Sequence, residues 1–326
     1  MVSINDVAKR AKVAKSTVSL VINDSGYVSQ KTREKVEQAM KELNYVPSQL
    51  AKNLSIRQSH IIGVVVPDIV HPFFSNFVKS IEKELYDRGY MTMVCSTLGR
   101  EQVEEEYLNW LNRRTMDGII MCAHTLAIEK YVNTKRPIVS LDRYLNNDIP
   151  VVSSDHRQAA ELTVEALRKN KCHNVVQFVG SSNANVGSEN YALTCKKLFE
   201  QKDGQVHFYK MQTNTFSLNE YLFAAQAAFK AFPGADAFVG SDMVITQCLK
   251  LALEKKLRIP EELKLIAYDG TQVTRIGYPK ISAVFQPVDQ LAFHAAEQII
   301  AKIENRPTAK ITKALPVSWL QGNTTY

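Results

Sequence analysis

A polar stretch near the N-terminus, residues 15–32, carries the side chains best suited to contact a nucleic acid. Its hydroxyl groups can bond phosphate oxygens and so fix a protein on a duplex; they belong to Thr17, Ser19, Ser29 and Thr32. Lys15 and Ser16 can reach base edges if they begin a helix that enters a groove. These residue types imply DNA as a partner, provided that the chain folds into elements that present them together.

Motifs of catalysis and metal binding are missing from the sequence, which contains no GxSxG, HExxH or Walker-type loop. The cysteines are too scattered to form a metal-binding pair, and their odd number argues against a closed set of disulfides; they are Cys95, Cys122, Cys172, Cys195 and Cys248. The adjacent Asp142 and Arg143 could support acid chemistry, but hydrogen bonds to a ligand explain the pair more simply. We expect neither an enzyme nor a metal or cofactor site.

Length and charge set further limits on the protein. The 326 residues are enough for two or three folding units, and 45% of them are hydrophobic. The chain has no apolar run of about 18 residues and no apolar signal core at its N-terminus, so we expect a cytoplasmic protein. The net charge of +7 is uneven, because residues 1–58 contain ten Lys/Arg and only five Asp/Glu. A basic head favours a polyanionic partner, although ribosomal and membrane-surface segments are charged similarly.

Three short helices are predicted in this head. Ser3 can cap the first helix, with Asp6 three residues further on. Residues 15–23 have apolar side chains on one face and polar ones on the other, and Ser29 can cap a third helix over residues 30–44. Two short helices across a tight turn, buttressed by a third, form a geometry that inserts one helix into the major groove. The same periodicity fits an ordinary three-helix bundle with solvated hydroxyls.

The motifs of the head resemble those of the lactose-repressor (LacI/GalR) family. The family pattern IxDVAxxAxVxxxTVSxVxN corresponds to INDVAKRAKVAKSTVSLVIN, and VSxxTREKVxxAMxxLNYxP corresponds to VSQKTREKVEQAMKELNYVP. The resemblance implies a sequence-specific DNA-binding regulator, most simply a repressor of a carbohydrate-use operon under the control of a small-molecule effector. It implies DNA contacts at Lys15, Ser16, Thr17, Ser19, Leu20, Asn23, Tyr27, Ser29, Thr32, Ala51 and Leu54.

Three residues of the head depart from the family pattern. Lys12 replaces the usual turn glycine, and Ala14 replaces the usual serine before the recognition helix, which removes a cap and a phosphate contact. Leu20 replaces a common arginine. Leucine can contact a thymine methyl but cannot form a bidentate bond to guanine. We therefore expect the operator to differ from the family's usual one at that base pair.

Residues 47–59 follow the helix-turn-helix domain, residues 1–46, and are predicted to form a hinge. A short helix over residues 48–54 is possible after Pro47, but it would be marginal alone in water. In the family this segment orders on DNA, where leucines wedge into a minor-groove base step. Leu54 lies at that position, with Ala51 one turn before it. A plain flexible linker is the alternative.

The body, residues 60–326, alternates strand-like and helical stretches in two series. The first series begins at IIGVVVP and the second at NVVQFVG. Such alternation predicts an α/β fold with parallel, doubly wound sheets in two lobes. This resembles the periplasmic-binding-protein-like body of the same family, whose crossovers imply one lobe of about 60–157 and 288–318. The other lobe would comprise about 158–287 and 319–326.

Loops after the strands supply the candidate effector site, because ligands bind at the carboxyl ends of such strands. Aromatic side chains there can stack on a sugar ring, and carboxylates and guanidinium groups can bond its hydroxyls. The resemblance implies contacts at Asp68, His71, Phe73, Phe74, Asp142, Arg143, Asn190, Tyr191, Ser241, Asp242, Asp269 and Gln286. Each of these residues could instead be a helix cap or a structural loop bond.

The match in the second lobe is imperfect. The family's arginine early in one helix falls near Asn190 or Tyr191, and its usual asparagine is Ser241. One explanation is that His71 and Tyr191 replace the missing groups; the alternative is an effector of another kind, a purine or a phosphorylated protein. A solute-binding protein is a further alternative for the body, but it would need export. A two-fold operator favours a homodimer, and the C-terminus lacks the leucine heptads of a tetramerising tail.

Overall fold

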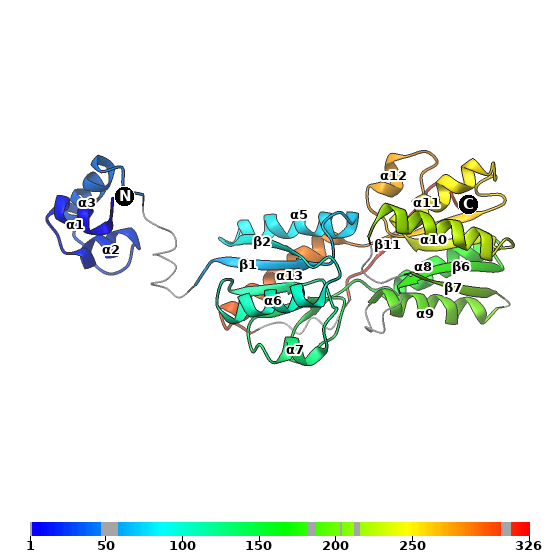
Figure 1. Ribbon diagram of the computed structural model, residues 1–326, viewed down its shortest axis with the longest axis horizontal. Coiled ribbons are helices and arrows are strands. Elements are labelled where there is room, and N and C mark those ends of the chain that lie inside the picture. The colour runs from blue at the N-terminus through cyan, green and yellow to red at the C-terminus, as the bar shows by residue number, and fades with distance from the viewer. Residues whose placement is uncertain (1, 47–57, 181–186, 203, 212–215, 308–313) are drawn as a thin grey trace. The chain divides into compact units, whose positions relative to one another are not determined.

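The computed structural model describes residues 2–46, 58–180, 187–202, 204–211, 216–307 and 314–326. The chain divides into two compact units, Met1–His60 and Ile61–Tyr326, which we call the head and the body. Each unit has its own hydrophobic core. Figure 1 shows both units and labels most of their helices and several of their strands.

The head consists of helices α1 (Ile4–Ala11), α2 (Lys15–Ile22) and α3 (Gln30–Glu42). Ser3 precedes α1, and its backbone N–H and its hydroxyl both donate to the Asp6 carboxylate. Ser29 caps α3 by accepting a hydrogen bond from the Thr32 N–H. The predicted helices are therefore confirmed, with α2 and α3 ending one and two residues before the expected ends.

The first sheet of the body is parallel and has the strand order β2-β1-β3-β4-β5. Its strands are β1 (Ile61–Val66), β2 (Met91–Ser96), β3 (Gly118–Met121), β4 (Ile138–Leu141) and β5 (Val151–Val152). Helices α5 (Pro72–Tyr86) and α13 (Val288–Ile303) pack on one face. Helices α6 (Glu101–Asn112) and α7 (Ile128–Val132) cover the other face. Because β-branched residues fill β1 and helices cover both faces, the strand is buried throughout most of its length.

The second sheet has the order β11-β10-β9-β8-β6-β7, and only the β10–β11 pair is antiparallel. Its strands are β6 (Asn174–Gly180), β7 (Gln205–Met211), β8 (Ala237–Ser241), β9 (Lys264–Asp269), β10 (Ser282–Phe285) and β11 (Ser318–Leu320). Helices α8 (His156–Lys169) and α9 (Gly187–Glu200) pack on one face. Helices α10 (Leu218–Ala231) and α11 (Asp242–Glu254) pack on the other, and the short α12 (Val273–Ile276) contacts α11.

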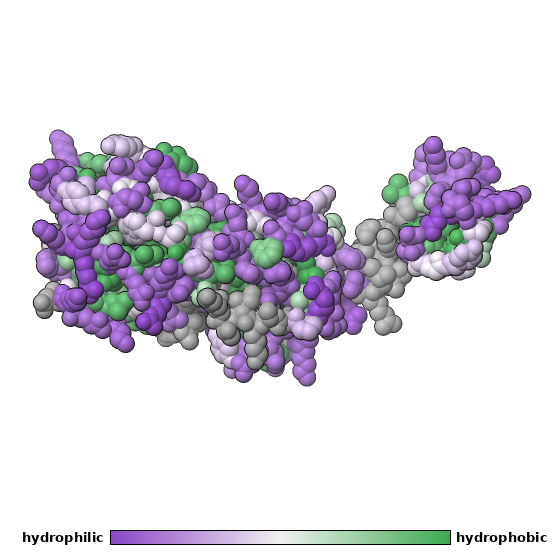
Figure 2. All heavy atoms as spheres, turned by 180° about the vertical axis from the view of Figure 1, so that it is seen from behind, coloured by the Kyte–Doolittle hydropathy of each residue, from purple (hydrophilic) through white to green (hydrophobic). Residues whose placement is uncertain are grey.

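The chain passes between the two sheets at three places. It leaves the first sheet between β5 and α8, returns between β10 and α13, and reaches β11 of the second sheet after α13. Helix α13 therefore belongs to the first sheet although it follows ten strands. The predicted α/β class with two parallel sheets is confirmed, except that β11 pairs antiparallel with β10 at the edge of the second sheet. Among the described residues, no helix is long and apolar enough to cross a membrane. Figure 2 shows one face on which hydrophilic side chains predominate, with smaller hydrophobic groups between them.

Candidate DNA-binding head and effector site

Helix α2 presents a polar face because its apolar residues point into the head core. Val18 and Val21 are buried in that core, whereas Lys15 and Ser16 at the start of the helix are exposed. Ser19 is half-buried on the same polar side. The first turn of α2 can therefore be placed in a groove without disturbing the packing of the head.

The turn before α2 bears two of the departures noted in the sequence. Lys12 ends α1 with φ = 54°, in the left-handed region that favours glycine. Ala14 is the N-cap of α2 and makes no side-chain cap hydrogen bond. The N-cap side chain thus offers no acceptor to the start of α2, and a phosphate oxygen can serve as one.

Several predicted DNA contacts lie around the C-terminal end of α2. Leu20 packs against Gly26, where an added Cβ would lie 3.3 Å from Leu20 Cδ2, yet 36% of the leucine remains exposed. The Asn23 amide donates to Ser19 Oγ at 3.2 Å. Tyr27 is 94% exposed. These residues border the polar face of α2 and leave an apolar spot within it.

The remaining predicted head contacts form two groups. Thr17 is half-buried on α2, and the hydroxyls of Ser29 and Thr32 lie 2.9 Å apart at the start of α3. Ala51 and Leu54, which carry the predicted minor-groove wedge, lie outside the described residues. The hinge therefore stays a prediction from the sequence.

We call each sheet of the body with the helices packed on it a lobe, and an aromatic cluster joins the two lobes near the end of β1. The ring of His71 lies 4.9 Å from that of Phe216, and Phe74 lies 6.0 Å from the same ring, measured between centroids. His71 and Phe74 belong to the first lobe, whereas Phe216 precedes α10 of the second. Burial lowers the pKa of His71 to about 4, so the imidazole is neutral. Its Nδ1 is buried without a hydrogen-bond partner in the described part of the chain.

Asp142 lies in a tight turn directly after β4. The Arg143 N–H donates to the Leu141 carbonyl at 2.9 Å, and Asp142 between them has φ = 63°. This is the geometry of a γ-turn with positive φ, which is rare and strained. Arg143 Nη1 donates to the carbonyls of His124 and Leu126 at 3.2 and 3.3 Å, so the guanidinium holds the neighbouring loop.

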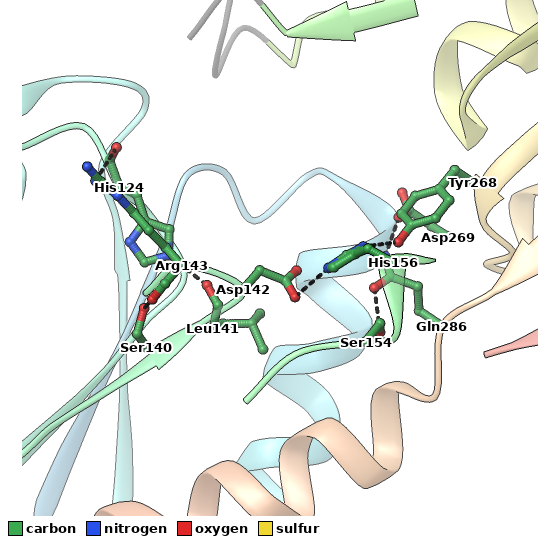
Figure 3. Close-up of polar contacts among 10 residues, drawn as sticks. All are labelled: His124, Ser140, Leu141, Asp142, Arg143, Ser154, His156, Tyr268, Asp269 and Gln286. Atoms are coloured by element: carbon green, nitrogen blue, oxygen red, sulfur yellow. Dashed lines mark hydrogen bonds and ion pairs between the residues drawn. The ribbon is translucent and has the colours of Figure 1, made fainter. Parts of the chain in front are cut away.

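A chain of polar contacts runs from Asp142 to the second lobe, as Figure 3 shows. Asp142 Oδ1 lies 2.9 Å from His156 Nε2, and His156 Nδ1 lies within hydrogen-bond distance of the Tyr268 hydroxyl. Tyr268 is on β9, next to Asp269 at the strand end. The chain therefore joins the carboxyl ends of β4 and β9.

A second polar chain connects the crossovers. Ser154 Oγ donates to Gln286 Oε1 at 2.8 Å, and Gln286 Nε2 donates to Asp269 Oδ1 at 2.7 Å. Burial, together with the nearby carboxylates of Asp242 and Asp142, raises the pKa of Asp269 well above its usual range. Asp269 is therefore protonated more readily than an ordinary carboxyl, and its protonated form can donate a hydrogen bond as well as accept one.

Two of the predicted effector residues have structural roles in this conformation. Asp242 is 1% exposed, and its carboxylate accepts hydrogen bonds from Gly270 N–H and from the N–H and hydroxyl of Thr271. Tyr191 packs in the core of the second lobe and hydrogen-bonds with Thr163 at 2.9 Å. Both residues therefore make structural bonds of the kind that the sequence offered as the alternative to a ligand role.

Four other predicted residues take no part in the two polar chains. Phe73 packs in the first-lobe core. Asp68 accepts a hydrogen bond from the Val70 N–H, and Ser241 precedes α11 without a side-chain cap bond. Asn190 is exposed on α9. The residues that the structure brings together are thus Asp142, Asp269 and Gln286 in one group and His71 and Phe74 in another.

Sequence reasoning missed four residues of this region, namely Phe216, His124, His156 and Tyr268. His156 follows a short strand and Tyr268 precedes Asp269, so the rule that ligands bind at strand ends could have included both. Phe216 carries no comparable signal, because its place beside His71 depends on how the lobes pack.

Comparisons with known proteins extend these observations. The family model described as bacterial regulatory proteins, lacI family, matches residues 3–48. The model described as periplasmic binding proteins and sugar binding domain of LacI family matches residues 59–318. The sucrose operon repressor of Streptococcus mutans is 32% identical over 326 residues and is covered to 98%, as is this chain. The ribose operon repressor of Halalkalibacterium halodurans is 32% identical over 326 residues, covering 100% of this chain and 97% of the relative.

Solved structures share the fold. The Lac repressor bound to ONPG in the repressed state superposes with a TM-score of 0.84 at 22% identity, over 99% of both chains. A periplasmic binding protein/LacI transcriptional regulator from Alkaliphilus metalliredigens, complexed with D-xylulofuranose, gives 0.75 at 22% identity, over 82% of this chain and 100% of that one. Because the family models match both the head and the body, the chain belongs to the lacI family of bacterial regulatory proteins.

Proposed function

We propose that this regulator represses an operon for carbohydrate use and that a sugar or sugar derivative, bound between the two lobes of the body, controls it. The relatives named sucrose and ribose operon repressors support a carbohydrate operon. The observation that carries DNA binding is the exposed polar first turn of α2 on a packed three-helix head. This is the geometry that reads the major groove.

The contacts to DNA divide into two kinds. Thr17, Ser19, Ser29 and Thr32 bond phosphate oxygens and set the register. Lys15 and Ser16 reach base edges, while Leu20 offers an apolar contact beside them. Leu20 lies beside Gly26 and is 36% exposed, so its methyl groups are accessible to a thymine methyl. We expect an A·T or T·A pair at this operator position.

The effector occupies the carboxyl ends of the strands, between Asp142 and Asp269 and the aromatic cluster of His71, Phe74 and Phe216. Sugar hydroxyls can donate to Asp142 and can either donate to or accept from Asp269, and the aromatic rings can cover the apolar face of a sugar. Contact with both lobes would let a ligand shift their relative position and thereby the DNA affinity. Such coupling is reciprocal, so operator DNA weakens or strengthens effector binding by the same factor.

A homodimer on a pseudo-palindromic operator completes the proposal. Strand β2 forms an edge of the first sheet, and Met91 and Val94 on it are exposed, as is Leu98 just beyond it. Exposed apolar residues along a sheet edge suit a contact with a second copy. Two heads held by one dimer match two half-sites related by a two-fold axis. Sedimentation of the full chain with and without operator DNA measures the oligomeric state and so tests the homodimer.

Operator binding is tested by gel shift with a fragment that the protein selects from a random pseudo-palindromic library. We expect Lys15→Ala and Ser16→Ala to weaken binding to that fragment, and Leu20→Arg to change the preferred base pair. Lys230→Ala, a change of an exposed cation on α10 of the body, is the matched control. If Lys15→Ala and Leu54→Ala both bind like the wild type, this mode of docking is wrong.

A further inference from the structure

His156 lies where the chain passes from the first sheet to the second, and both of its ring nitrogens are engaged. Strand β5 ends at Val152, and α8 begins at His156. The two partners are Asp142, which follows β4 of the first sheet, and Tyr268, which lies on β9 of the second. A single imidazole therefore bridges the lobes (Figure 3).

The chemistry of the two partners decides which nitrogen carries the proton. An ionised Asp142 can only accept a hydrogen bond, so His156 Nε2–H donates to it. Burial raises the pKa of Tyr268 well above its usual range, so its hydroxyl keeps the proton and can donate to Nδ1. A proton on Nε2 satisfies both contacts, whereas a proton on Nδ1 alone could donate to the Tyr268 oxygen but would leave Nε2 with no hydrogen for the Asp142 carboxylate.

The ring of His156 is also held by packing. It stacks on Tyr268 at 6.0 Å between centroids, and Tyr268 in turn lies 4.3 Å from Tyr191. A Cβ added to Gly187, the first residue of α9, would lie 1.9 Å from His156 Nε2. Because the space around the ring is this tight, a shift of His156 must be transmitted to Tyr268 and to the start of α9.

Asp142 is the end of this chain at which a ligand can act. Its side chain is 21% exposed, whereas that of His156 is 10% exposed. The residue is held in a strained γ-turn, and its contact with His156 orients the carboxylate. A hydroxyl that donates to Asp142 must either share the carboxylate with His156 or displace it.

We propose that His156 is the positioning residue that couples an effector bound at Asp142 to the contact between the lobes. The proposal rests on the proposed function, in which Asp142 binds the effector. His156 orients Asp142 for the ligand, and it transmits the occupation of Asp142 to Tyr268 on β9. Removing the imidazole therefore leaves a carboxylate that can still bind a hydroxyl but separates binding from the response of the DNA-binding head.

The first test needs no effector. Side-chain ¹H–¹⁵N spectra of the full chain should show His156 protonated on Nε2, with Nδ1 as an acceptor. Asp142→Asn and Tyr268→Phe should each move these signals, whereas His173→Asn, a change of an exposed histidine, should only remove its own. The proposal is overturned if the proton lies on Nδ1, or if the His156 signals stay unchanged in both Asp142→Asn and Tyr268→Phe.

The second test uses D-ribose and sucrose as probes, the sugars named for the relatives. Calorimetry measures sugar binding, and fluorescence anisotropy measures release of the selected operator fragment. We expect His156→Ala to keep the sugar affinity within about tenfold while the coupling to release falls about 5–150-fold, the usual range of coupling between sites. His156→Gln, which retains a donor and an acceptor, should restore coupling, and Gly187→Ala should reduce it by displacing the ring.

The outcomes are separable. If His156→Ala weakens sugar binding and operator release by the same factor, or changes neither of them, His156 does not couple the two. If His156→Gln behaves like His156→Ala although it folds, the hydrogen bonds are not the cause, which also overturns the proposal. If the wild type binds operator but neither sugar, D-ribose and sucrose are not its effectors, and the spectra still decide whether the contact chain exists.

Discussion

Acid should destabilise the first lobe through two buried histidines. Burial lowers the pKa of both His71 and His124 from 6.5 to about 4. In each ring Nδ1 has no hydrogen-bond partner within the described residues. Below pH 6.5 the two histidines are protonated in the unfolded chain but stay neutral in the folded lobe. The free energy of unfolding therefore decreases as the pH falls from 6.5 towards 4.

The magnitude follows from the two pKa values. A difference of one in pKa between the folded and unfolded states corresponds to 1.36 kcal/mol. Each histidine therefore lowers the free energy of unfolding by about 3 kcal/mol at pH 4 relative to pH 7. Two such losses together are a large part of the total stability of a typical domain, about 5–15 kcal/mol. The second lobe should respond in the opposite direction, because burial raises the pKa of Asp242 from 3.8 to about 6. A carboxyl of this kind favours the folded state increasingly as the pH falls from 6 to 4.

The two tryptophans of the chain allow the lobes to be followed separately. Trp110 lies on α6 of the first lobe, and Trp319 lies on β11 of the second. Urea unfolding of Trp319→Phe reports the first lobe, and urea unfolding of Trp110→Phe reports the second. Between pH 7 and pH 4 we expect the midpoint seen by Trp110 to fall and that seen by Trp319 to hold or rise.

A double variant tests the cause of the acid response. His71→Asn with His124→Gln should flatten the pH dependence of the Trp110 transition, whatever it does to stability at pH 7. His173→Asn, a change of an imidazole that is exposed in the folded chain, is the matched control and should leave the slope as in the wild type. An unchanged slope in the double variant would refute the reasoning, because the protons would then be binding elsewhere.

Three further substitutions probe stability. Lys12→Gly should stabilise the head by about 1 kcal/mol, because φ is 54° there and glycine adopts positive φ without strain. Lys12→Ala should not stabilise it, and thermal unfolding of the head followed by circular dichroism distinguishes the two variants. Glu104→Gln should lower the stability of the first lobe by about 1–3 kcal/mol, because the buried carboxylate accepts from Thr125 and Tyr131; an unchanged Trp110 transition would contradict this. Gly270→Ala should cost more than about 1 kcal/mol, because φ is +64° and the new Cβ would lie 2.8 Å from Phe285 Cα; Trp319 fluorescence in urea is the measurement.

Much of the architecture follows from local patterns. The helical spacing of Val18 and Val21 placed α2 and its polar face, and Ser29 marked the start of α3. The alternation of apolar runs and helical stretches predicted two parallel sheets. These features depend on neighbours in the sequence, so residue types and spacing determine them. The rule that ligands bind at strand ends brought Asp142 and Asp269 into one site for the same reason.

Only the tertiary structure decided how those strand ends are joined. Asp242 has the same carboxyl group as Asp142, but that group accepts hydrogen bonds from backbone N–H groups 28 and 29 residues away. His156 meets Tyr268 across 112 residues, and Phe216 meets His71 across the two lobes. Burial and partners far away in the sequence decide which polar atoms hydrogen-bond within the protein and which remain available to a ligand. No local pattern contains that information, because it arises only when the two sheets pack together.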